Sequence, residues 1–420
     1  MRSIFLVTLL IAACVVAVDG ASREQEREAA SNSLDSHTGP IHTNLSSYFE
    51  LLSTRYRFSN DGTGQKHIVA EIRIANLLGA RQRSRLTFDY QPLNQQLEIV
   101  YIRIRKRDGR IEHIITNQVI KTPHILSAAT LPEVDFNEHT INVPNLQPGD
   151  LLEYDVATII RHPVAPFQFW VVHNFNPNDA VVEELEIDVP KGRSVKMATT
   201  FGPQALPVES GGMDIYYWKR QNPTPKIELT SIDSAHIAIP DVQLSSFLSW
   251  EDVGRWYSDI EKNSRTPTPD VASRAIEITR GLQTDSEKAE ALYNFTARDI
   301  KSISLLSLGI GGYKPSMAGD VLKRGWGDCK DKAVLLSALL ESEGLHVASV
   351  LISPDREFSP SVPSPWYFDH LIVMLRIANK EIWMDPTSAG LPMGTLDQHL
   401  CDKEALVMPP NGDPYLGSTP

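Results

Sequence analysis

One stretch, Val321–Gly344, constrains the fold and the chemistry of this chain more than any other. A glycine-containing loop ends at Asp328, and apolar residues then recur at helical spacing, which predicts a helix that begins at Cys329 and buries one face. Gly344 stands where a left-handed C-cap would end this helix. The positive end of a helix dipole favours the thiolate, the nucleophilic form of cysteine. The stretch therefore predicts a reactive thiol at a helix start, and the glycines would let a substrate approach it.

Two downstream residues could complete a site around this thiol. His370 lies within Trp366–Ile377, an apolar and β-branched run that predicts a strand. A turn and a second short strand, Glu381–Met384, lead to Asp385. Residues on adjacent antiparallel strands lie about 5 Å apart, so the imidazole and the carboxylate could face each other. With Cys329 first, the chain order is that of a nucleophile, a base and a group that orients the base.

These segments resemble the motifs of the transglutaminase-like superfamily, which shares the papain-type fold. The residues that carry the resemblance are Gly327–Ala333 (GDCKDKA), Asp369–His370 and Asp385–Thr387. The resemblance covers residues 241–410 and implies a helical lobe that carries the cysteine and an antiparallel sheet that carries the histidine and the aspartate. It also implies a thioester on Cys329, a peptide or glutamine-type amide as substrate, and no requirement for a metal or a cofactor.

Three further residues are weaker candidates for the cleft. The resemblance implies an upstream group that assists the oxyanion, and Tyr313 could supply it, although such donors are defined by geometry. Asp328, next to Cys329, is expected to line the cleft. Trp366 either walls the cleft or simply packs in the core, and the sequence leaves both readings open.

Residues 48–240 show a different pattern. Apolar and polar residues alternate in Lys66–Ala75, Leu97–Lys106 and Glu183–Val189, which predicts half-buried strands, and turn signals such as Asp108–Gly109 separate them. Many short strands with regular turns favour an antiparallel β-sandwich. The region resembles the β-rich domain of unknown function that often precedes the transglutaminase-like module in bacterial envelope proteins. It could bind an envelope or cell-wall partner, or simply shield the catalytic module.

The expected fold class is therefore α+β. The β-sandwich occupies 48–240, with a linker rich in proline, threonine and serine at 221–241, and the transglutaminase-like domain and a short tail follow at 241–410 and 411–420. Relatives often continue with another β-rich segment, so a chain that stops at Pro420 is either short by nature or incomplete.

The first 47 residues predict export. At 1–20, one arginine precedes an apolar run that is too short for a comfortable membrane span, which is typical of a secretory signal cleaved before Ala21. Alternatively, Ile11–Cys14 resembles a lipoprotein box, in which case a lipid on Cys14 would hold the protein at a membrane. Residues 21–47 are polar and predict a flexible tether. The expected location is periplasmic or extracellular.

Charge and cysteine content narrow the function further. The net charge of −12 and the lack of a basic aromatic patch argue against a nucleic-acid partner. After cleavage of a signal peptide, Cys329 and Cys401 would remain, and in an oxidising compartment they could form a disulfide that silences the nucleophile. The sequence predicts acyl transfer at a thiolate, with hydrolysis and amine crosslinking both open. The alternative is a catalytically silent envelope binding or scaffold protein.

Overall fold

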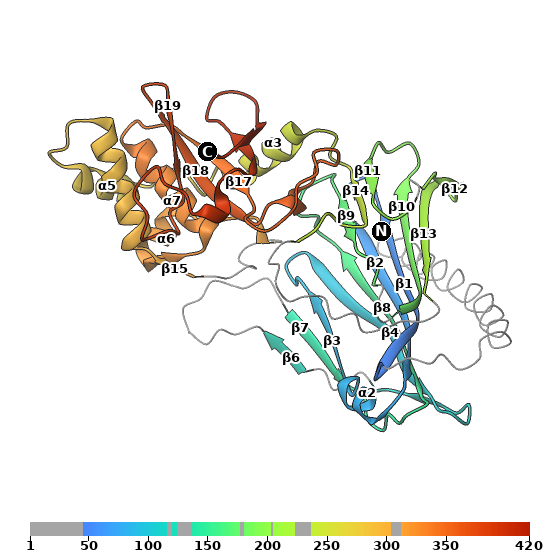
Figure 1. The fold of residues 1–420 in the computed structure, drawn as a ribbon. Coiled ribbons are helices and arrows are strands. Elements are labelled where there is room, and N and C mark those ends of the chain that lie inside the picture. The colour runs from blue at the N-terminus through green and yellow to red at the C-terminus, as the bar shows by residue number, and fades with distance from the viewer. Residues whose placement is uncertain are drawn as a thin grey trace, which may run out of the picture.

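The structure, a computed structural model, describes residues 45–115, 120–123, 137–176, 180–202, 205–222, 237–303 and 312–420. The predicted signal peptide and nearly all of the predicted tether lie outside these residues. Figure 1 shows a part made almost entirely of strands beside a part in which helices cover a sheet. The predicted α+β fold class, with a β-rich N-terminal region, is thus confirmed. Within the described residues, no helix is long and apolar enough to cross a membrane.

The N-terminal domain is built on one large sheet. Its strands lie in the order β12-β13-β10-β1-β2-β8-β4-β5. Their bounds are β1 (Ser47–Phe58), β2 (Gly64–Ile74), β4 (Gln95–Arg105), β5 (Ile111–His113), β8 (Leu151–Ile160), β10 (Ala180–Pro190), β12 (Val208–Ser210) and β13 (Met213–Gln221). The three alternating segments correspond to β2, β4 and β10, and the predicted turn at Asp108–Gly109 joins β4 to β5.

The large sheet is mixed, so the prediction of a purely antiparallel domain is wrong in one respect. β1 and β10 pair in parallel, whereas the other neighbours in this sheet are antiparallel. A parallel pair needs a long connection, and the chain runs through all the intervening strands before β10 returns beside β1. Period-two alternation identifies a strand but carries no information about its direction.

Two small sheets pack against the large one, as a sandwich requires. They have the orders β3-β7-β6 and β11-β14-β9. Their strands are β3 (Arg85–Tyr90), β6 (Ile120–Pro123), β7 (Asn137–Asn142), β9 (Trp170–His173), β11 (Lys196–Thr199) and β14 (Val242–Ser245), and a short helix, α2 (Leu77–Gln82), follows β2. One core joins Ile72 and Ile104 of the large sheet to Ile141, and a second joins Leu185 to Leu244.

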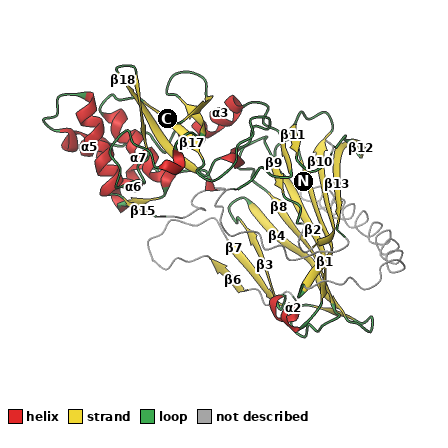
Figure 2. Cartoon of the chain, viewed as in Figure 1, coloured by secondary structure: helices red, strands yellow, loops and turns green. Residues whose placement is uncertain are grey.

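The C-terminal domain packs helices against an antiparallel sheet of order β19-β18-β17-β20-β21 (Figure 2). The helices are α3 (Trp250–Glu261), α4 (Pro269–Thr279), α5 (Asp285–Arg298), α6 (Ala318–Arg324) and α7 (Cys329–Ser342). The strands are β17 (Val347–Ile352), β18 (His370–Ile377), β19 (Lys380–Met384), β20 (Glu404–Met408) and β21 (Tyr415–Ser418), and a parallel pair joins β15 (Lys301–Ser302) to β16 (Trp326–Gly327). Residues 411–420, predicted as a tail, contain β21, whose four residues are too few for a periodic signal.

Helix α7 is the centre of this domain. It was expected to bury one face, but every residue from Lys330 to Leu340 is buried. The cause is its position, because α4, α5 and α6 contact it together with β17 and β18. A helix enclosed in this way has few permissive positions, and its first residue, Cys329, is held where the surrounding elements place it.

Candidate active site

The N-terminus of α7 is fixed by a buried capping box. The Asp328 carboxylate accepts a hydrogen bond from the Asp331 N–H at 3.0 Å, and the Asp331 carboxylate accepts one from the Asp328 N–H. Asp331 also accepts from the Ser316 N–H at 2.8 Å and from the Arg324 guanidinium. These contacts satisfy helix N–H groups that would otherwise lack acceptors, and they hold Cys329 at the first helical position.

The same contacts change the interpretation of two predicted features. Asp328, expected at the cleft, is instead a buried N-cap whose carboxylate is paired with Lys330. The glycine that precedes it has a packing role, because a Cβ atom on Gly327 would lie 2.5 Å from the Asp331 Cβ. Gly325 ends α6 in the left-handed conformation, with φ of 73°. Packing therefore requires the glycine at 327, and backbone conformation favours the one at 325.

The structure brings His370 and Asp385 together from neighbouring strands. His370 is the first residue of β18, and Asp385 directly follows β19, whose last paired residue is Met384 opposite Val373. Extending this register places Asp385 diagonally across from His370 on the same face. The His370 Nε2 lies 3.0 Å from Asp385 Oδ2. The carboxylate also accepts hydrogen bonds from the Thr387 N–H and hydroxyl at 2.9 and 2.7 Å.

Cys329 completes the group. Its side chain interacts with the His370 imidazole and helps to raise the pKa of that ring. Because Nε2 faces Asp385, Nδ1 is the ring nitrogen left for the sulfur. Burial lowers the pKa of His370, but the hydrogen bonds to Asp385 and Cys329 outweigh it and raise the pKa to about 10. Burial raises the pKa of Asp385, but the hydrogen bonds from His370 and Thr387 outweigh it and lower the pKa. The arrangement favours an imidazolium that is paired with the Asp385 carboxylate.

Both cysteines of the described residues are free thiols. The Cys401 Sγ lies 3.5 Å from the Asp397 carbonyl oxygen rather than against Cys329. The silencing disulfide considered from the sequence is therefore not formed in this structure. Within the described ranges, no group of three or more His, Cys, Asp or Glu side chains is arranged to hold a metal ion.

Residues 272–383 match the family model of the transglutaminase-like superfamily. The C-terminal domain is transglutaminase-like. Residues 60–227 match a domain of unknown function, DUF3857, for which a solved structure exists. No curated protein matches the chain at a significant level.

Solved structures show where the same architecture recurs. A crystal structure of a candidate protease from Parabacteroides distasonis is 16% identical, with a TM-score of 0.69 over 86% of this chain and 70% of that one. This shows a shared fold across both the DUF3857 region and the transglutaminase-like domain. An M1 zinc metallopeptidase from Deinococcus radiodurans is 12% identical over 48% of this chain and 42% of its own, with a TM-score of 0.26. That similarity is too low to carry an argument.

The two aromatic candidates lie beside the transglutaminase-like site in different ways. Tyr313 packs edge-on against Trp256 and Trp170, with ring centroids 5.3 and 6.2 Å apart, so the structure assigns it to the domain interface. Burial raises its pKa to about 12, which keeps the phenol neutral. Trp366 is half-buried, and the Arg356 guanidinium lies 4.8 Å from its ring centroid and donates to its carbonyl oxygen. It is thus part of the segment that leads to His370.

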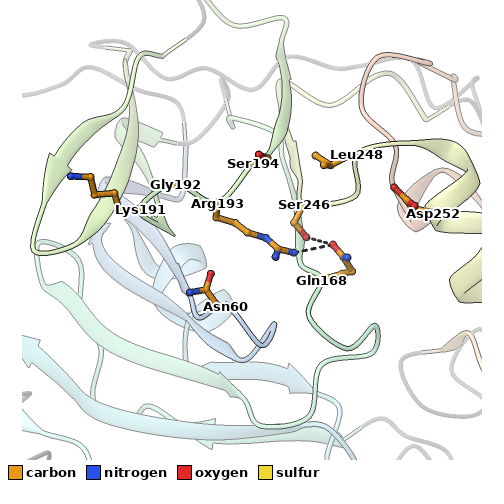
Figure 3. A pocket seen from close by; sticks show the side chains of 9 residues that line it. All are labelled: Asn60, Gln168, Lys191, Gly192, Arg193, Ser194, Ser246, Leu248 and Asp252. Atoms are coloured by element: carbon orange, nitrogen blue, oxygen red, sulfur yellow. Dashed lines mark hydrogen bonds between the residues drawn. The ribbon is translucent and has the colours of Figure 1, made fainter.

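A hollow at the domain boundary is separate from these residues. It has a volume of about 520 Å³ and is lined by side chains that include Lys191, Arg193, Ser246, Leu248 and Asp252 (Figure 3). Figure 3 also shows hydrogen bonds that join Arg193 and Ser246 to Gln168. None of the six candidate residues lines this hollow.

Sequence reasoning missed Lys332, a fully buried lysine one turn after Cys329. Its ammonium donates to the carbonyl oxygens of Ala297 and Ile300 and to the Ser302 hydroxyl, at 2.7 to 3.2 Å. It thereby ties the end of α5 and strand β15 to α7. Burial lowers its pKa to about 8. The only sequence signal was a lysine on a helix face that is otherwise apolar.

The contacts of His370 predict a pH dependence of stability. Because the pKa of His370 is raised from 6.5 to about 10, its stabilising contribution is fully present below pH 6.5 and is lost as the pH rises toward 10. The wild type should therefore have a higher free energy of unfolding than His370→Gln. This difference should be largest at about pH 6 and should vanish at about pH 10. Urea unfolding of both proteins across this range measures it, and an excess that stays constant would contradict the assignment.

Tyr257 on α3 provides a second prediction. Its side chain is fully buried, and its hydroxyl has no hydrogen-bond partner among the described residues. An unpaired buried donor is costly, so Tyr257→Phe should raise the unfolding free energy by about 1 kcal/mol. The matched control is Tyr293→Phe, because the buried Tyr293 hydroxyl lies 3.3 Å from the Asp385 carbonyl oxygen and the control should lower stability. Urea unfolding distinguishes the two, and a loss of stability in Tyr257→Phe would refute the first expectation.

Proposed function

We propose that this chain is a cysteine-dependent hydrolase or acyltransferase that acts on peptide amides. The observation that supports the proposal is the 3.0 Å approach of His370 Nε2 to Asp385 Oδ2, together with the place of Cys329, whose side chain interacts with His370, at the start of a buried helix. The transglutaminase-like family match supports a cysteine nucleophile, and the description of the Parabacteroides relative as a candidate protease supports a peptide substrate.

In the first step, the Cys329 thiolate attacks the amide carbonyl carbon and forms a C–S bond. The C–N bond then breaks, and the amine leaves with a proton from the His370 imidazolium. The Cys329 N–H, at the first position of α7, has no intrahelical acceptor and can donate to the oxyanion. One such donor is worth about 3 kcal/mol in the transition state.

In the second step, water or a primary amine attacks the thioester and gives its proton to His370. The C–S bond breaks, which releases a carboxylic acid or a new amide and regenerates the thiolate–imidazolium pair. Asp385 keeps the imidazole oriented through both steps and stabilises its charged form. We propose hydrolysis as the main outcome and crosslinking as the competing one.

Trapping of the thioester tests the proposal. The purified protein is incubated with casein-derived peptides and hydroxylamine, which converts an acyl-enzyme to a hydroxamate that mass spectrometry detects. Parallel reactions in water and with a fluorescent primary amine report hydrolysis and transfer separately. Hydroxamates that depend on Cys329 are expected. If folded wild-type protein yields neither hydroxamate nor cleaved or labelled peptide, the catalytically silent scaffold is the correct interpretation.

We also propose export, which the composition of residues 1–20 supports. Mass spectrometry of the protein from its native host distinguishes the outcomes: an N-terminus at Ala21 indicates a cleaved signal, and a lipidated Cys14 indicates a lipoprotein. An intact Met1 would overturn the proposal.

A further inference from the structure

Strand β14 is enclosed by both domains. All four of its residues are buried, although it belongs to a sheet of only three strands. Val242 and Leu244 point into the core of the N-terminal domain with Val171 of β9. Alternation directs Gln243 to the opposite face, toward the transglutaminase-like domain. There its side-chain oxygen accepts a hydrogen bond from the hydroxyl of Tyr367, and both side chains are at most 2% exposed.

The partner of Gln243 belongs to the segment that delivers the histidine. We call residues 353–369 the histidine loop, because they connect the end of β17 to His370 at the start of β18. Apart from a single 3-10 turn at Pro365–Tyr367, this loop has no helix or strand of its own. Loops of this kind move unless contacts from elsewhere hold them. Tyr367, close to His370 in the sequence, joins this loop to β14.

A second contact holds the other end of the histidine loop. Just before β14, the Ile237 N–H donates to the Asp355 carbonyl oxygen at 2.7 Å, and its carbonyl oxygen accepts from the Glu357 N–H at 2.9 Å. Arg356 lies between these residues. Its guanidinium stacks on Trp366, donates to the Trp366 carbonyl oxygen, and lies 3.4 Å from the carboxylate of Asp369.

We infer that the segment of the N-terminal domain containing Ile237 and Gln243 positions His370 against Cys329 by clamping the histidine loop at both ends. Backbone hydrogen bonds with Ile352 hold Asp369 and His370 at the start of β18, whereas most of the preceding residues lie in the loop. Arg356 and Tyr367 are therefore positioning residues. The N-terminal domain then helps to position a residue of the proposed catalytic centre, rather than serving only as a shield or a binding module. This inference rests on the proposed function.

The test needs no knowledge of the substrate. Iodoacetamide alkylates Cys329, and the rate is followed by mass spectrometry from about pH 5 to 10, with His370→Ala as the reference for a thiol that lacks its imidazole. The variants are Tyr367→Phe, which removes one hydroxyl, and Arg356→Met, with Arg356→Lys as the conservative rescue. The matched control is Ser246→Ala. It removes a buried hydroxyl from the same segment, but this hydroxyl hydrogen-bonds to Gln168 and Phe169 and not to the histidine loop.

A displacement of about 1 Å between reacting groups can lower the rate by a factor of about 100. We expect the loss of either anchor, Tyr367 or Arg356, to displace His370 by part of this distance. Alkylation near about pH 6 should therefore fall about tenfold in Tyr367→Phe and Arg356→Met, and their pH profiles should move toward that of His370→Ala. Ser246→Ala should match the wild type, and Arg356→Lys should recover part of the loss. Thermal unfolding verifies that each variant is folded.

The outcomes separate the inference from the proposed function. Wild-type profiles in folded Tyr367→Phe and Arg356→Met overturn the positioning role while leaving the triad intact. An equal loss in Ser246→Ala also overturns it, since a general loss of stability would then explain the effect. If Arg356→Met does not fold, the alkylation profile of Tyr367→Phe alone tests the positioning role. A wild-type profile identical to that of His370→Ala overturns the proposed function, and the inference with it.

Discussion

Cys329→Ala and His370→Ala are each expected to lower kcat for peptide cleavage by about 10⁴-fold, because each removes one member of a group that acts as a unit. In the proposed mechanism Cys329 is the nucleophile and His370 its base, so the loss of either leaves only substrate binding and oxyanion contacts. Initial rates with a peptide found by thioester trapping, together with KM, provide the measurement. The losses should also be non-additive, with the double variant no slower than either single one.

The control for this experiment is Cys401→Ala. Cys401 is the other free thiol of the described residues, and it lies against Asp397 rather than His370. Its replacement should leave kcat unchanged. Substantial remaining activity in Cys329→Ala, or an equal loss in Cys401→Ala, would show that the reaction does not depend on the proposed nucleophile.

The second large effect is expected on stability. Asp331→Ala should lower the free energy of unfolding by about 3–5 kcal/mol, because it leaves the Arg324 guanidinium without its carboxylate in a half-buried site. It also removes the acceptor of the Ser316 and Asp328 N–H groups. Urea unfolding measures the change, and Cys329 alkylation should become slower because the start of α7 loses its support.

A second capping box in the same chain provides the matched control. In α5, Glu287 accepts from the Thr284 N–H as Asp331 does from the Asp328 N–H, but it does so in solvent. Glu287→Ala should therefore shift the urea midpoint much less. If the urea midpoint shifts equally in the two variants, then burial and the ion pair with Arg324 do not strengthen the capping box of α7.

Local signals allowed much of the site to be predicted from the sequence. The start of α7 follows from a cap, a first turn and an apolar run that lie next to one another in the chain. The meeting of His370 and Asp385 follows from one hairpin, whose register a short turn determines. In both cases the decisive residues are close in sequence, so propensity and periodicity are sufficient.

The features that could not be predicted all depend on contacts between distant segments. The burial of Asp328, which was expected at the cleft, depends on how α4, α5 and α6 pack around α7. Tyr313 was assigned to the oxyanion because nothing in its neighbourhood reveals Trp170, which comes from the other domain. The parallel pairing of β1 with β10 and the contact of Gln243 with Tyr367 likewise join residues more than a hundred positions apart.

The enclosure of β14 determines where this protein can be divided. The two family matches end at residue 227 and resume at 272, and β14 lies in the interval that neither claims. A fragment that started at 241 would keep this strand but strip it of β9 and β11, which leaves Val242 and Leu244 facing water. The boundary at residue 241 that the sequence suggested is thus unsuitable for truncation, because β14 needs β9 and β11 beside it.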